Sequence, residues 1–161
     1  MAQNVNSYTI NGTNIIIKVS DYVRIRSNDP KPYTLVARVE LLGIEHQMAL
    51  IRWYYLPEET EQGRKSFHGI KEVFLSNHYD VQSIHTIQGK YVVYSLENYM
   101  NLKRVGVDDY FFRFEYNYVK KCHVDVFVVV YCECEMPYNP DLFIVQCDGC
   151  KCRYILSKYH Q

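Results

Sequence analysis

The chain has 161 residues, 48% of them hydrophobic, so it is long enough to bury one ordinary core with a small appendage. Its 18 basic residues balance 18 acidic ones, which argues against sequence-specific DNA binding, because DNA-binding modules carry a basic excess. Residues 1–8 lack the apolar region of a signal peptide, and the longest apolar run, 126–131, is too short to span a bilayer. We therefore expect no membrane association and a reducing compartment, where the six cysteines suggest metal ligands or free thiols before disulfides.

Short β-branched and alternating runs, separated by turn-forming residues, predict a chain built mainly from strands. The expected strands cover residues 14–19, 22–26, 33–42, 48–55, 73–75, 91–94, 110–116 and 124–131. Loops or turns are expected at 27–32, 58–66 and 76–80, and a short helix at 96–102. Many short strands with little helix predict a compact all-β barrel or sandwich.

The most informative stretch is Arg52-Trp53-Tyr54-Tyr55-Leu56-Pro57-Glu58-Glu59, at the end of an expected strand. Strand alternation puts Trp53 and Tyr55 on one face and Tyr54 on the other. Two aromatic rings followed by two carboxylates suit a pocket for a quaternary ammonium, because aromatic faces attract positive charge. The alternative is that both rings belong to the core, where aromatic residues of strands are often found.

Several motifs of this sequence follow one another in an order that resembles the BAH (bromo-adjacent homology) domain. They are Arg52-Trp53-Tyr54-Tyr55-x-Pro57-Glu58-Glu59, Phe67-His68-Gly69-x-Lys71-Glu72, Asp108-Asp109-Tyr110-Phe111 and Cys134-Glu135-Met136-Pro137-Tyr138-Asn139-Pro140. More narrowly, the chain is similar to the plant BAH-PHD histone readers of the Early-bolting-in-short-days and Short-life type. The resemblance extends from about residue 7 to residue 150.

The resemblance implies a distorted β-barrel with short helices over residues 7–131 and a cysteine-rich tail over 132–161. BAH domains of this type hold a trimethyl-lysine in an aromatic cage, and two of its walls correspond to Trp53 and Tyr55. The third wall of the family is a tyrosine at the position that Leu35 occupies here. Tyr33 lies one strand step of about 7 Å further back on the same face. Either Tyr33 supplies the third wall or the third side is aliphatic.

The resemblance also assigns a peptide-binding role to two polar residues of the stretch Ser76-Asn77-His78-Tyr79-Asp80. His78 is expected to pack on or hydrogen-bond the histone peptide beside the lysine, and Asp80 to accept a hydrogen bond from it. Asn77 replaces an aspartate of the family, which removes one negative charge from a surface that meets a basic tail.

The tail resembles the first half of a PHD finger. Its thiolate pairs have strong zinc spacing, and the ligands implied are Cys132, Cys134, Cys147 and Cys150. The later ligands of a cross-braced finger are missing, because Ile155 occupies the place of the ligand histidine and the sequence given ends at Gln161. We expect a truncated finger, in which the four cysteines either share one improvised zinc or bind none. We also expect poor order after Cys134 and unchanged peptide binding when 132–161 are removed.

The adjacent pair Cys122 and His123 does not indicate catalysis, because neighbouring residues in a strand point apart and no complete catalytic motif accompanies them. The sequence therefore indicates a nuclear, non-enzymatic chromatin reader. The resemblance implies that it binds the trimethylated lysine of a histone tail, the Polycomb-type repressive mark. The alternative is a scaffold with a degenerate cage that docks other chromatin-associated proteins.

Overall fold

The computed structural model describes residues 3–27, 35–124, 136–146 and 153–156. The strands are β1 (Asn4–Val5), β2 (Ser7–Thr9), β3 (Ile16–Lys18), β4 (Tyr22–Ile25), β5 (Leu35–Gly43), β6 (Met48–Tyr55), β7 (Glu72–Ser83), β8 (Ile87–Ser95), β9 (Asp109–Asn117), β10 (Cys122–His123), β11 (Phe143–Gln146) and β12 (Arg153–Leu156). The helices are short: α1 (Leu96–Met100) and the 3₁₀ turns η1 (Pro57–Glu59) and η2 (Ile84–Thr86). None of the described helices is long and apolar enough to cross a membrane. The predicted mainly-β fold is confirmed.

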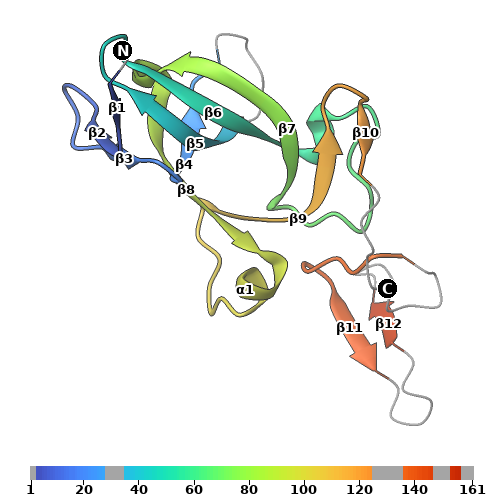
Figure 1. The fold of residues 1–161 in the computed structure, drawn as a ribbon. Coiled ribbons are helices and arrows are strands. Elements are labelled where there is room, and N and C mark those ends of the chain that lie inside the picture. The colour runs from blue at the N-terminus through green and yellow to red at the C-terminus, as the bar shows by residue number, and fades with distance from the viewer. Residues whose placement is uncertain (1–2, 28–34, 125–135, 147–152, 157–161) are drawn as a thin grey trace.

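One large sheet organises the molecule (Figure 1). Its strand order is β1-β5-β4-β8-β9-β7-β6, and β6 also pairs with β5, so the pairings run in a closed circuit from β5 back to β5. Neighbouring strands are antiparallel except that β9 is parallel to both β7 and β8. The tilt and bulges that closure requires are provided by register shifts in β5, β6 and β7.

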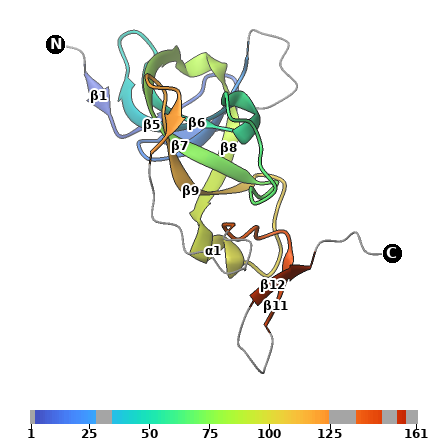
Figure 2. The same cartoon turned by 90° about the vertical axis from the view of Figure 1, so that its right-hand side faces the viewer.

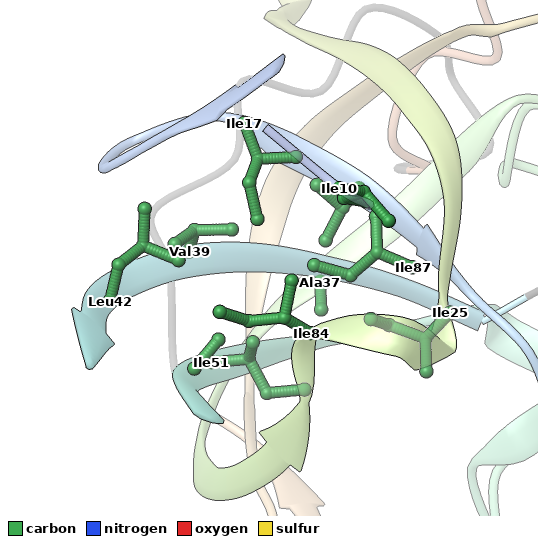
Figure 3. Packing of buried hydrophobic residues seen from close by; sticks show 11 residues of the cluster. Ile10, Ile17, Ile25, Ala37, Val39, Leu42, Ile51, Ile84 and Ile87 are labelled. Atoms are coloured by element: carbon green, nitrogen blue, oxygen red, sulfur yellow. The ribbon is translucent and has the colours of Figure 1, made fainter. Parts of the chain in front are cut away.

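The main core lies against the inner faces of β4, β5 and β6 (Figure 3). Aliphatic side chains from several strands and η2 point toward one another there; the cluster is Ile10, Ile17, Val23, Ile25, Ala37, Val39, Leu42, Ala49, Ile51, Ile84 and Ile87. A second cluster consists of Val36, Tyr54, Val73, Tyr91 and Val93. The alternation along β6 therefore directs Ile51 and Trp53 to the first cluster and Tyr54 to the second.

Most of the predicted strands correspond to observed ones, but β1, β2, β10, β11 and β12 were not predicted, and the strand expected at 73–75 is much longer. Residues 76–80 were expected to form a turn, but they continue β7 as far as Ser83. That expectation is wrong because Ser76 pairs with β9 and residues 79–83 pair with β6, and these long-range pairings outweigh the turn preference of Ser, Asn and Asp. The strand expected at 124–131 lies outside the described residues apart from Val124, which is in no strand.

Residues 136–142 pack against the main sheet domain at the loop before β7. Asn139 is 8% exposed, and its Nδ2 donates to the carbonyls of Ser66 at 2.8 Å and His68 at 3.2 Å. Asp141 accepts from the Ile70 amide at 2.5 Å. The expected poor order after Cys134 therefore does not describe this segment. The hairpin of β11 and β12 follows it, at the end of the molecule away from β1 (Figure 2).

A buried ion pair fixes the same junction. Arg113 donates through Nε to Glu72 at 2.7 Å, with the Arg113 side chain 9% and the Glu72 side chain 0% exposed. The remaining guanidinium nitrogens donate to the carbonyls of Phe67 and Tyr138. One side chain of β9 therefore joins β7, the preceding loop and the tail segment. The expected domain boundary at residue 131 stays a prediction, because 125–135 are not among the described residues.

Candidate functional site: an aromatic pocket at the end of the sheet

A pocket opens where β5, β6 and β7 meet η1. Its volume of about 100 Å³ far exceeds the roughly 10–15 Å³ that one water needs. We call it the aromatic pocket, and its lining residues are Leu35, Trp53, Tyr54, Tyr55, Glu59 and His78. No lysine or arginine is among these described lining residues. The lining is thus mainly aromatic and aliphatic, and it includes one carboxylate, that of Glu59.

A bulge between β6 and β7 brings His78 to the pocket. The register shifts between Arg52 and Tyr54, so Trp53 faces the bulged part of β7 rather than a single partner. The Ser76 hydroxyl donates to the Trp53 carbonyl at 2.6 Å and accepts from the His78 amide at 3.1 Å. These two hydrogen bonds tie the bulge to β6 and fix the position from which the His78 ring reaches the pocket.

The rings around His78 form a continuous aromatic group. The His78 ring lies 6.1 Å from Tyr55 and 6.4 Å from Trp53, centroid to centroid. Tyr118 stacks on it at 3.8 Å with only 4° between the planes, and the Tyr118 ring also lies 6.2 Å from Tyr55. Tyr116 supports Tyr55 at 5.4 Å. The two pocket aromatics of β6 are thus held in place by residues from β7, β9 and the turn after β9.

Burial sets the protonation states inside the pocket. It raises the pKa of Tyr55, so the phenol keeps its proton, and it lowers the pKa of His78, so the neutral imidazole is favoured. The Tyr55 hydroxyl lies 2.7 Å from His78 Nδ1. We assign the Tyr55 hydroxyl as the donor and His78 Nδ1 as the acceptor, which places the imidazole proton on Nε2. The wall of the pocket formed by His78 is therefore uncharged near neutral pH.

The two carboxylates after the aromatic motif have different roles. Glu59 lines the pocket, and its Oε2 accepts from the Leu56 amide at 2.8 Å, which caps η1. Glu58 instead pairs with Arg64 on the surface. Pro57, at the first position of η1, ends β6 and turns the chain so that Glu59 returns over the pocket. Among the described residues, Glu59 is therefore the one acidic residue that lines the pocket.

The structure describes only some of the residues named in the sequence predictions for this site. Trp53 and Tyr55 share one pocket, and Trp53 also packs against the main core. Leu35 lies at the third side. Tyr33, the other candidate, lies outside the described residues. The role of these side chains as a methyl-lysine cage stays a prediction.

His78 and Asp80 differ in position. His78 lines the pocket, whereas Asp80 does not; its carboxylate accepts from Gln82 Nε2 at 2.6 Å and from the Val81 amide at 2.8 Å. Tyr118 was not found by sequence reasoning, because nothing in its local pattern signals contact with a residue 40 positions earlier. A peptide-binding role for His78 and Asp80 stays a prediction.

The metal prediction concerns residues outside the described part of the chain, namely Cys132, Cys134, Cys147 and Cys150. Among the described residues, no group of three or more His, Cys, Asp or Glu side chains is placed to hold a metal. Cys122 is exposed, while the ring of its neighbour His123 packs edge-on against Phe74 at 4.8 Å. The zinc prediction is therefore neither supported nor opposed by the structure.

Comparison with known proteins places this site in a family context. The profile of the BAH domain matches residues 15–126, which include the whole lining of the aromatic pocket. The chain is 49% identical over 150 residues to the Arabidopsis thaliana protein named chromatin remodeling protein EBS, covering 91% of this chain and 64% of that protein. It is 47% identical to chromatin remodeling protein SHL of the same plant, covering 91% and 66%. The chain thus spans a little under two thirds of the length of these relatives.

The fold also has a counterpart among solved structures. The crystal structure of the yeast Rsc2 BAH domain matches 78% of this chain and 55% of that chain, with a TM-score of 0.59 and 21% identity. At this identity the match concerns the arrangement of the strands, and it carries no information on the ligand.

Proposed function

The chain belongs to the BAH domain family, and from this premise we propose that it is a nuclear, chromatin-associated reader of methylated lysine. In the proposal, the aromatic pocket binds the trimethylated lysine of a histone tail that carries the Polycomb-type repressive mark. The observation that carries it is the pocket itself, in which Trp53, Tyr55 and Glu59 line one cavity. Similarity to two proteins named for chromatin remodeling supports the chromatin setting.

The chemistry of the pocket suits a methylated ammonium better than an unmodified one. Methylation makes the cation larger and more weakly hydrated, so its desolvation costs less, and aromatic faces stabilise its charge. Leu35 adds apolar contact for the methyl groups, and the Glu59 carboxylate adds an opposite charge. This mode of binding requires no catalytic group, metal or nucleic acid.

The proposal is tested first at Trp53. Trp53→Ala removes one cation–π wall, and we expect trimethyl-peptide binding to weaken by about 1–3 kcal/mol. Because Trp53 also packs on the main core, the variant is expected to lose stability, so affinity is measured by calorimetry on protein shown to be folded by circular dichroism. Val107→Ala, which changes a side chain that is 80% exposed before β9, is the control and should bind as the unaltered chain does.

A second variant separates binding from packing. Tyr55 lines the pocket but is in neither hydrophobic core cluster, so Tyr55→Ala should weaken binding with a smaller loss of stability. Unchanged affinity in both folded variants would contradict the proposal.

The alternative function is a protein-interaction scaffold with a degenerate cage. The observation that favours it is Leu35, an aliphatic residue on the third side of the pocket. A scaffold of this kind would dock other chromatin-associated proteins and would show no preference for a methylated peptide. The same titrations distinguish the two functions.

A further inference from the structure

The second half of β7 has a partner on one side only. β6 pairs with β7 at Phe74 and Leu75 and, beyond the bulge at 76–78, again from Tyr79 to Ser83. β9 pairs with the other side of β7 only as far as Ser76, where Ser76 lies opposite Tyr116. Within the part of the chain that the structure describes, no strand pairs with residues 77–83 on that side. We call this stretch the open edge (Figure 1).

The pairing with β6 determines which backbone amides and carbonyls of the open edge point away from β6. The Ile84 amide donates to the Gln47 carbonyl at 2.9 Å, which continues the ladder between β7 and β6. Because an antiparallel strand alternates, the amides and carbonyls of Tyr79 and Val81 then point away from β6. The Val81 amide agrees with this direction, since it donates to the side chain of Asp80 at 2.8 Å and not to β6.

The open edge is accessible and adjoins the aromatic pocket. The side chains of Tyr79 and Val81 are 50% and 55% exposed. His78, the residue just before them, lines the pocket. An unpaired edge of this kind invites an added strand, and proteins usually protect such edges. Here the Asp80 carboxylate bonds to the outward Val81 amide, which is one such protection and which a competing carbonyl is able to replace.

We infer that the open edge binds the peptide backbone on either side of the methylated lysine as an additional β-strand. This rests on the proposed function and adds how the partner is held: main-chain hydrogen bonds to Tyr79 and Val81 provide affinity, and the aromatic pocket provides specificity. The occupant is an extended basic peptide, because Asp80, freed from Val81, then faces its cationic side chains. Arg52 lies over the Tyr79 ring and donates to the Ser76 carbonyl.

The test is a backbone N-methylation scan of the peptide, with the chain unaltered. The probe is a histone-tail peptide trimethylated at the lysine of the Polycomb-type mark, with one amide methylated at a time beside that lysine. Loss of one main-chain hydrogen bond is expected to weaken binding about tenfold. The losses should fall on every second residue, because only alternate amides of an added strand face the open edge.

A pair of variants tests the same bonds from the protein side. Val81→Pro removes the outward amide and leaves the β6 ladder intact, as proline is tolerated where its nitrogen faces away from a partner strand. Val81→Ala keeps the amide and is the matched control. Val81→Pro should weaken binding about tenfold, the value of one lost hydrogen bond, while Val81→Ala should not.

The outcomes distinguish the open-edge proposal from the reader function on which it rests. Alternating losses in the scan support strand addition even if Val81→Pro fails to fold. Binding of the parent peptide without any alternation overturns the open-edge proposal and leaves the reader function standing. Failure of the parent peptide to bind overturns both.

Discussion

His78 connects the aromatic pocket to the rest of the fold through a ring stack with Tyr118 and a hydrogen bond at Nδ1. Its stack on Tyr118 and its hydrogen bond to the Tyr55 hydroxyl hold the ring in one orientation and in one tautomer. The hydrogen bond depends on a neutral ring, because a protonated Nδ1 no longer accepts from the Tyr55 hydroxyl. Two carboxylates lie near the His78 ring, those of Asp80 and of Glu59 in the pocket. Asp80 raises the pKa of His78, but burial lowers it by more, so the net shift is downward.

We therefore predict that peptide binding weakens in acid. Protonation of His78 breaks the bond with Tyr55 and places a positive charge beside the bound ammonium. Since burial lowers the pKa of His78, the loss should begin below the usual range of histidine, and titrations between about pH 8 and about pH 5 will locate it.

The matched variant is Tyr55→Phe, which keeps the ring and removes the hydroxyl. Without that donor, neutral His78 loses a stabilising hydrogen bond, so the acid loss should move to higher pH. Identical pH profiles in the variant and the unaltered chain would contradict the role given to this bond.

At the scale of elements, the tail segment 136–142 behaves as part of the main domain. Its connection rests on buried polar contacts: Asn139 bonds to two carbonyls of the loop before β7, and Arg113 reaches the Tyr138 carbonyl. Gly69 allows this approach, since a Cβ at that position would lie 3.0 Å from the Pro140 side chain. A chain ending at residue 131 loses these contacts, so we now expect it to be less stable than one ending at 146.

The variant that tests this junction is Asn139→Ala. It leaves the carbonyls of Ser66 and His68, the second of them buried, without this donor, and we expect a loss of about 1–3 kcal/mol in the free energy of unfolding by urea. Phe143→Ala, four residues later with a side chain 76% exposed, should change stability by less than about 0.5 kcal/mol. Equal stability of the two variants would show that the segment does not contribute to the domain.

The local features of this site could be predicted from the sequence, but the contacts between residues distant in the chain could not. The shared face of Trp53 and Tyr55 follows from the period of a strand, and the break after them follows from Pro57. The continuation of β7 through residues 76–80 did not, because it depends on long-range pairing of Ser76 with β9 and of Tyr79 and Asp80 with β6. The stack of Tyr118 on His78 also joins distant residues, and no local pattern specifies it.

For the whole molecule, burial of a titratable side chain, His68, makes the stability of the fold depend on pH. His68 is 5% exposed among aromatic rings, and burial lowers its pKa to about 4. Its Nδ1 accepts from the Lys65 amide at 2.9 Å, which requires an unprotonated nitrogen. The folded chain therefore binds a proton at this position less readily than the unfolded chain does.

This linkage predicts acid destabilisation. Above the usual histidine pKa of 6.5, His68 is neutral in both states and its full contribution to stability is present. As the pH falls from 6.5 to about 4, His68 becomes protonated in the unfolded state but stays neutral in the folded state. This difference lowers the free energy of unfolding by up to about 3 kcal/mol. Urea unfolding across this range measures the loss, and His68→Phe should reduce its slope. A slope unchanged by that substitution would assign the pH dependence to other groups.

The central claim, that the aromatic pocket reads a methylated lysine, is tested most directly by one calorimetric titration series on the full chain. Histone-tail peptides of identical sequence carry the lysine with three, two, one or no methyl groups. We expect affinity to fall as methyl groups are removed, with the trimethylated peptide bound at least about tenfold more tightly than the unmodified one, because desolvation of the cation costs progressively more. Equal affinity for all four peptides would contradict the claim.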